Sequence, residues 1–200
     1  MIAPLALLVL AAQRPTSLVF IRHAETLANK TGHYNARTLN SFSPLGASKI
    51  AAATGQLEAM GRFDKILVSP SPRVLMTIAP YLRDTHQKAL VWPLLYECCT
   101  DRRPAGAHAT KFKWGAKISI PAALTGLFVI DPAHDRLPVS PDYDAGLAQV
   151  AACVEEFKRL YSGGHVLLAG HSGEGGHLLH ELTGRWIKVE NAKPISVEVH

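Results

Sequence analysis

Short runs of β-branched and aliphatic residues alternate with longer amphipathic segments along most of this 200-residue chain. Four runs are short enough and sufficiently β-branched to favour buried strands over helices: 17–21 (SLVFI), 65–68 (KILV), 89–92 (ALVW) and 165–169 (HVLLA). Strands that alternate with helices favour a mainly parallel sheet with helices on both faces. We therefore expect an α/β protein with a three-layer α/β/α sandwich.

The helical segments carry start and stop signals. Ser43 followed by Pro44 predicts a capped helix with proline in its first turn, and Gly61 predicts the end of that helix. Three further helices are predicted from apolar residues at helical spacing, over 75–82, 147–161 and the segment after Gly173.

The composition is that of a globular domain. Apolar residues at 48% and charged residues at 18% exclude a disordered chain, and 200 residues can form one full core. The net charge is +5, but the basic residues are scattered except over 102–117, so we expect no nucleic-acid partner. Cys98, Cys99 and Cys153 have no zinc-site spacing, and we expect free thiols.

Residues 1–16 precede the expected domain, which covers 17–200. The apolar run over 2–12 is too short to span a bilayer, so no stable membrane span is expected. It resembles the core of a secretory signal peptide, with Ala11 and Ala12 near a cleavage point, but no basic residue precedes it and Pro4 interrupts it. Two interpretations stay open: a signal peptide of an exported, periplasmic protein, or an apolar extension of a cytoplasmic one.

Charged side chains gather where the predicted strands end. Arg22 and His23 follow the first strand, Arg73 the second, Glu97 the third and His171 the fourth. The carboxyl ends of parallel strands share one edge of a sheet, where ligands bind, so we expect these residues to meet. Guanidinium groups suit phosphate, and their charge keeps a nearby histidine neutral and nucleophilic. Such a set can support phosphoryl transfer without a metal.

Four sequence elements, in this order, resemble the histidine phosphatase superfamily, also called phosphoglycerate mutase-like proteins. FIRHAETLAN (20–29) resembles the family signature Arg-His-Gly-Glu-Thr-x-x-Asn, and SPSPRVLMT (69–77) resembles its Ser-Pro-x-x-Arg element. LYE (95–97) resembles the stretch that bears the acid, and AGHSG (169–173) the element of the second histidine. The ending NAKPISVEV is similar to the last strand of the family. The resemblance covers 17–199 and implies the family's fold.

The resemblance also implies a role for each matching residue. His23 is implied as the nucleophile that becomes a phosphohistidine, and Glu97 as the general acid and then the base for water. His171 is implied as a third catalytic residue. The implied phosphate pocket consists of Arg22, Asn29, Arg73 and His171. No metal and no cofactor are expected.

Several residues offer alternatives to these assignments. Glu25, Asp101 and Glu174 compete with Glu97 for the role of the acid. One predicted helix carries His177, His180 and Glu181, but the order His-x-x-His-Glu matches neither zincin motif, so we expect no metal site there. Ala24 replaces the commoner glycine, which should be tolerated if its backbone dihedrals are ordinary.

The segment 98–143 is rich in Pro, Gly and Lys and lacks clear periodicity. We expect it to be irregular, to lie over the pocket and to select the substrate. It does not resemble the corresponding part of phosphoglycerate mutases, and the chain is shorter than theirs, which favours a hydrolase. We therefore predict a metal-independent phosphatase that hydrolyses a phosphomonoester of a small molecule or a phosphoprotein.

Three other functions are weighed against this prediction. The first is a phosphoglycerate mutase-type phosphotransferase, and the second is a non-catalytic module that binds phosphorylated ligands. The third is a serine hydrolase that uses Ser172, because residues 170–174 match Gly-x-Ser-x-Gly except at Glu174.

Overall fold

Six strands form one sheet in the order β4-β3-β2-β5-β1-β6 in a computed structural model that describes residues 15–99 and 113–199. Five strands run parallel, and β6 pairs antiparallel with β1 at one edge. The strands are β1 (Thr16–Arg22), β2 (Lys65–Val68), β3 (Ala89–Val91), β4 (Phe128–Ile130), β5 (Gly164–Gly170) and β6 (Ile195–Val199). The predicted strands are confirmed as β1, β2, β3 and β5.

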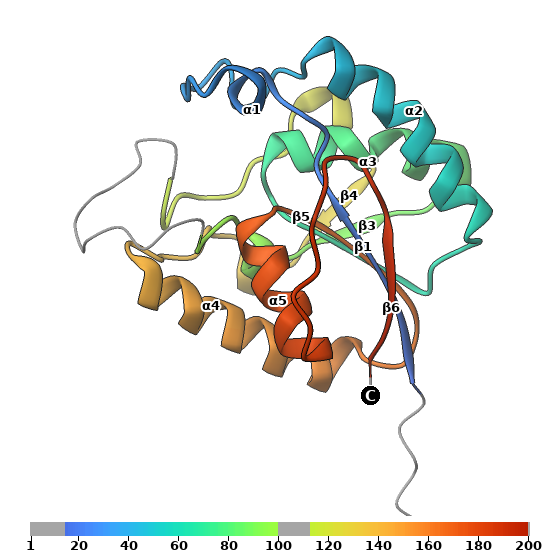
Figure 1. Ribbon diagram of the computed structural model, residues 1–200, viewed down its shortest axis with the longest axis vertical. Helices are drawn as coiled ribbons and strands as arrows, with labels where there is room; N and C mark the ends of the chain where they lie inside the picture. The colour runs from blue at the N-terminus through green and yellow to red at the C-terminus, as the bar shows by residue number, and fades with distance from the viewer. Residues whose placement is uncertain (1–14, 100–112, 200) are drawn as a thin grey trace, which may run out of the picture.

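Helices cover both faces of the sheet, and the predicted three-layer architecture is confirmed (Figure 1). One face carries α2 (Pro44–Ala59) and α3 (Pro72–Thr85), and the other carries α4 (Tyr143–Glu156) and α5 (Gly173–Thr183). A π-helical turn (Phe157–Tyr161) extends α4, and the short helix α1 (Leu27–Thr31) follows β1. Among the described residues, three segments form 3-10 helices: η1 (Pro93–Leu95), η2 (Ala122–Leu124) and η3 (Pro132–His134).

The central strands are buried on both faces because their side chains alternate between two cores. In β1, Val19 and Ile21 pack with α2 and α3, whereas Leu18 and Phe20 pack with α4 and α5. Burial on both faces explains why these strands are continuous apolar runs rather than alternating patterns.

The strand β4 lies inside 98–143, which was expected to be irregular. It pairs with β3 at the sheet edge through only three residues, Phe128 to Ile130. Three residues are too few to show a hydrophobic period, so sequence patterning could not predict this strand.

Some expectations concern residues that lie outside the described part of the chain, which excludes 1–14, 100–112 and 200. These expectations are most of the signal peptide over 1–16, whose Thr16 already belongs to β1, Asp101, most of the basic cluster over 102–117 and part of 98–143. Within 15–99 and 113–199, none of the helices combines the length and the apolar character needed to cross a membrane.

The predicted start of α2 is confirmed in detail. The Ser43 side chain accepts a hydrogen bond from the Gly46 N–H at 2.9 Å, and Pro44 occupies the first helical position. Gly61 follows the helix with φ +87, in the left-handed region that glycine adopts readily. The capped start of α2, at Ser43, lies against the loop that follows β1.

Two glycines of α2 give opposite predictions for stability. A Cβ on Gly46 would lie 2.0 Å from the backbone oxygen of Glu25, whereas a Cβ on Gly55 would meet nothing within 4 Å. We expect Gly46→Ala to lower the free energy of unfolding by about 1–3 kcal/mol through overpacking. Gly55→Ala should raise it by about 0.5–1 kcal/mol, because alanine loses less entropy in a helix. Urea unfolding followed by circular dichroism measures both, and equal signs would contradict the packing described here.

Candidate active site

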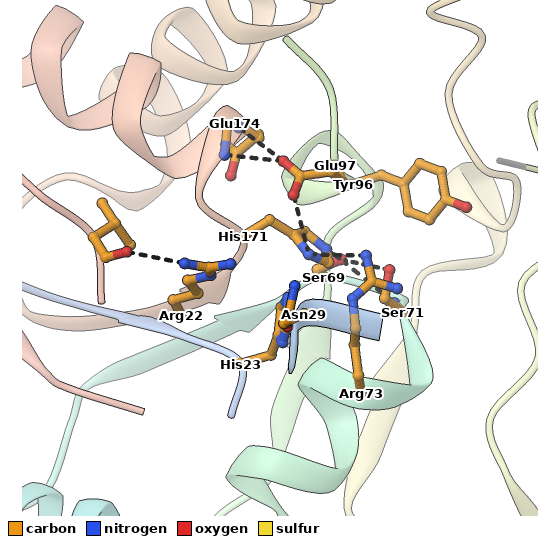
Figure 2. A network of polar contacts seen from close by, with 12 residues as sticks. Arg22, His23, Asn29, Ser69, Ser71, Arg73, Tyr96, Glu97, His171 and Glu174 are labelled. Atoms are coloured by element: carbon orange, nitrogen blue, oxygen red, sulfur yellow. Dashed lines mark hydrogen bonds and ion pairs between the residues drawn. The ribbon is translucent and has the colours of Figure 1, made fainter. Parts of the chain in front are cut away.

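Polar side chains from adjacent parallel strands meet at the carboxyl edge of the sheet (Figure 2). His23 follows β1, His171 follows β5 and Ser69 follows β2. The two imidazole rings meet edge to face, with their centroids 5.3 Å apart. The expectation that the strand ends bring these histidines together is therefore confirmed.

The backbone around His23 is held from three sides. Its N–H donates to the Gly170 carbonyl oxygen at 3.1 Å, and its own carbonyl oxygen accepts from Asn191 Nδ2 at 2.8 Å. The next residue, Ala24, donates its N–H to Thr77 Oγ1 at 2.9 Å. Its φ is not positive, so alanine is tolerated there in place of the commoner glycine. These contacts join the end of β1 to β5, to α3 and to the segment before β6.

The ring of His23 has a defined tautomer. Nδ1 lies 2.8 Å from the Ala24 carbonyl oxygen. Because a carbonyl can only accept, Nδ1 carries the proton and Nε2 carries the lone pair. The side chain is buried, and burial is the main cause that lowers the pKa of His23 well below its ordinary value, followed by the positive charge of Arg73 and then that of Arg22. The imidazole is thus a neutral base beside two cations.

The lowered pKa of His23 gives a prediction about pH. Only a neutral imidazole can attack an electrophile, so His23 should keep its reactive form at pH values below about 6.5, where an ordinary histidine becomes protonated. An NMR titration of the ring proton signals, assigned by comparison with His23→Ala, measures the midpoint. We expect it below 6.5, and a midpoint at or above 6.5 would contradict the buried, cation-flanked environment.

His171 belongs to a chain of side-chain hydrogen bonds. Arg73 Nη2 donates to His171 Nδ1 at 3.2 Å, so the neutral ring carries its proton on Nε2, which lies 2.8 Å from Ser69 Oγ. Ser69 Oγ in turn lies 3.4 Å from Ser71 Oγ. Both ring nitrogens contact protein side chains, so a direct bond from His171 to a phosphoryl oxygen would replace one of these contacts.

Two guanidinium groups lie beside His23. Arg73 is in the first turn of α3, where the helix dipole disfavours a cation. Arg22 Nη1 donates to the Val189 carbonyl oxygen at 3.3 Å, and its buried Nε has no hydrogen-bond partner among the described residues. Burial lowers the pKa of both arginines. Two partly desolvated cations with a buried donor left over are suited to an anion.

Glu97 lies at the N-terminus of α5, next to His171 (Figure 2). Its Oε1 accepts the backbone N–H groups of Gly173 and Glu174, both at 3.1 Å. Its Oε2 lies 3.9 Å from His171 Nδ1. Because N–H groups can only donate, Oε1 is fixed as an acceptor, and Oε2 is the oxygen on the histidine side that can carry a proton.

Two of the competing carboxylates point elsewhere. Glu25 Oε1 accepts from the Ser43 hydroxyl at the start of α2. Glu174 is fully buried, its Oε1 lies 3.9 Å from Cys153 Sγ, and its Oε2 has no hydrogen-bond partner among the described residues. Burial, and next the charge of Glu97, raise the pKa of Glu174 well above its ordinary value, so this carboxyl group is neutral. Among the described carboxylates named as alternatives, Glu97 is the one beside His171.

Asn29 orients its amide through a reciprocal cap of α1. Asn29 Oδ1 accepts the Thr26 N–H at 3.2 Å, and the Asn29 N–H donates to Thr26 Oγ1 at 3.2 Å. Since Oδ1 is occupied by the cap, the Nδ2 group is left to donate to a ligand in the pocket.

The chain matches one family of known proteins over most of its length. The family model described as histidine phosphatase superfamily (branch 1) matches residues 18–198. The chain belongs to the histidine phosphatase superfamily. Among curated protein sequences, none matches the chain.

Several solved structures have the same fold. The α-ribazole phosphatase from Shigella flexneri is 18% identical, with a TM-score of 0.61 over 90% of this chain and 89% of that one. A mycobacterial glucosyl-3-phosphoglycerate phosphatase is 17% identical, with a TM-score of 0.59 over 92% of each chain. Phosphoglycerate mutase from Bacillus anthracis str. Sterne is 15% identical, with a TM-score of 0.60 over 93% of this chain and 88% of that one. At these identities the likeness establishes the fold.

The site also includes residues that the sequence analysis did not single out. Ser69 contacts His171, Thr77 holds the backbone after the nucleophile candidate, and Asn191 holds its carbonyl. Ser69 and Thr77 lie in the matched element SPSPRVLMT, so its spacing could have indicated them. Asn191 is far away in sequence, and no local pattern points to it.

The motifs set aside from the site lie elsewhere. His177 and His180 both contact the Trp186 ring, with centroids 5.0 and 4.2 Å away. Within 15–99 and 113–199, no group of three or more His, Cys, Asp or Glu residues could hold a metal ion. Ser172 is the N-cap residue of α5, but its side chain makes no capping hydrogen bond.

Proposed function

We propose that this superfamily member is a phosphatase that hydrolyses a phosphomonoester through a phosphohistidine on His23. The observation that carries the proposal is the state of that ring: a buried, neutral imidazole whose Nδ1 is committed to the Ala24 carbonyl, and whose pKa is lowered by burial and by the charges of Arg73 and Arg22. A neutral nucleophile beside fixed cations suits an anionic electrophile, and phosphate is an anion that guanidinium groups bind well.

In the first step, His23 Nε2 attacks phosphorus and the bond from phosphorus to the ester oxygen breaks. Arg22 and Arg73 would bind the phosphoryl oxygens, with the Asn29 amide as a further donor. Their charges stabilise the negative charge on these oxygens in the transition state. The hydrogen bond from Nδ1 to the Ala24 carbonyl stabilises the positive charge that the ring gains.

Glu97 would move the protons. Its Oε2, on the histidine side, gives a proton to the leaving oxygen, so that the product departs as a neutral alcohol. In the second step Oε2 takes a proton from water, the water oxygen attacks phosphorus, and the bond between nitrogen and phosphorus breaks. Inorganic phosphate leaves, and both residues return to their starting states.

Arg22 and Arg73 supply the positive charge that this scheme requires, which is why we propose a metal-independent reaction. The substrate class is a phosphorylated small molecule, or a phosphoprotein whose phosphate reaches the pocket. The proteins of like fold named above include two phosphatases, which is consistent with this class.

Turnover in the presence of a chelator tests the proposal. Purified protein with EDTA is offered an aryl phosphate, a phosphoglycerate, a set of sugar phosphates and nucleotides, and phosphopeptides. Released phosphate, isomeric products and binding of each compound are measured. We expect release from at least the aryl phosphate. Conversion of a phosphoglycerate to its isomer without release would indicate a mutase, and binding without turnover would indicate a phospho-ligand binding module; either result contradicts the proposal.

A further inference from the structure

Two adjacent cysteines follow Glu97, the carboxylate beside His171. Cys98 is bonded directly to Glu97, and its thiol is hydrogen-bonded to that of Cys99 and donates to the Gly146 carbonyl oxygen at 3.4 Å. Cys98 is 5% exposed, whereas Cys99 is half-buried. The pair thus consists of a buried cysteine and a more exposed one, with their thiols in contact.

The neighbouring helix leaves room for this pair. A Cβ on Gly146 of α4 would lie 2.7 Å from Cys99 Sγ and 3.2 Å from Cys98 Cβ. Cys99 also adopts φ +56, in the left-handed region that side chains rarely occupy. A close helix and an unusual backbone therefore hold the two sulfurs side by side.

We propose that Cys98 and Cys99 form a dithiol modification site, which a hydroperoxide converts to a disulfide. The disulfide displaces Glu97 and thereby slows the hydrolysis for which Glu97 moves the protons. The effect on hydrolysis rests on the proposed function, whereas formation of the disulfide does not.

The chemistry balances with one hydroperoxide for each dithiol. The sulfur of the more exposed Cys99, as its thiolate, attacks one peroxide oxygen; the O–O bond breaks, the sulfur becomes a sulfenic acid, and hydrogen peroxide loses its other oxygen as water. The Cys98 sulfur then attacks the Cys99 sulfur, the S–O bond breaks, and the oxygen leaves as a second water with the Cys98 proton. The hydrogen bond with Cys99, and next burial, raise the pKa of Cys98, which disfavours its thiolate and leaves the first attack to Cys99.

Closing this disulfide must move the backbone beside Glu97. Consecutive Cα atoms are about 3.8 Å apart across a trans peptide, whereas ordinary disulfides need about 4.4 Å or more. No rotation of the joining peptide reaches this separation, so the disulfide is strained and the backbone dihedrals of both cysteines must change. Cys98 transmits that change to Glu97, to which it is bonded. Strained disulfides are more easily reduced, so the modification should be reversible.

Cys153 is the internal comparison. It is fully buried on α4 and contacts Glu174 Oε1, and burial raises the pKa of its thiol. Such an inaccessible thiol should react far more slowly. Cys153→Ala is thus a matched control.

Peptide mass spectrometry and phosphatase assays of hydrogen peroxide-treated protein test the proposal together. We expect the peptide with Cys98 and Cys99 to lose two hydrogens and to resist alkylation until dithiothreitol is added. A displacement of about 1 Å in a catalytic group can cost on the order of 10²-fold in rate, so activity should fall by that order and return on reduction. Cys98→Ser and Cys99→Ser should resist inactivation, while Cys153→Ala should remain sensitive.

The outcomes separate the two proposals. A peptide that keeps its two hydrogens overturns the dithiol site, whether or not the protein is active. Inactivation that persists in Cys98→Ser and Cys99→Ser also overturns it. Untreated wild-type protein without turnover contradicts the proposed function alone, because the mass change in that protein is measured independently and needs no variant.

Discussion

Replacing His23 with alanine is expected to reduce phosphate release by on the order of 10⁴-fold or more, as loss of a catalytic nucleophile does in other enzymes. The neighbouring His171 cannot replace it as the nucleophile, because both ring nitrogens of His171 are already hydrogen-bonded, to Ser69 and to Arg73. Steady-state turnover of an aryl phosphate measures the loss.

The same variant should still bind an anion, because the two arginines remain. Isothermal titration with inorganic phosphate measures this, and loss of binding together with turnover would indicate a collapsed pocket instead. His180→Ala is the matched control, since that histidine stacks on Trp186 rather than facing the pocket. If His23→Ala kept full activity, His23 could not be the nucleophile.

Replacing Glu97 with glutamine should give the second largest effect, on the order of 10²–10⁴-fold for alkyl phosphates. The amide can still accept the N–H groups of Gly173 and Glu174, but it can neither give a proton to the leaving oxygen nor take one from water. With an aryl phosphate the first step needs little proton transfer, so the variant should show a stoichiometric burst of phenolate followed by slow turnover. Stopped-flow absorbance detects the burst.

Glu174→Gln is the matched control for the Glu97 variant. The Glu174 side chain is buried, and its raised pKa keeps it neutral, so the amide changes neither shape nor charge appreciably. We expect turnover close to that of the parent protein. A loss as large as that of Glu97→Gln would show that Glu174, not Glu97 alone, moves the protons.

The sequence predicted the layers and the edge on which the site lies because both follow from local rules. Apolar runs such as 65–68 mark strands buried on both faces, and Ser43 with Pro44 marks a helix start. Once the strands are parallel, their carboxyl ends must share an edge, so Arg22, His23 and His171 had to meet there.

The rest of the site depends on geometry that has no local signal. Glu97 lies beside His171 only because the short turn η1 carries the chain over the start of α5, where two amides bind its carboxylate. Glu174, one residue along the helix from Gly173, points instead into the apolar core next to Cys153. Long-range partners such as Asn191 are likewise invisible until the chain folds.

Trapping the phosphoenzyme tests the central claim most directly. Protein mixed with ³²P-labelled substrate is quenched within milliseconds, digested and sequenced by mass spectrometry. We predict a label that is labile in acid and stable in base, on the peptide that contains His23, and its absence from His23→Ala. A label stable in acid and labile in base, as on Ser172, or turnover without any label on His23, would contradict the account.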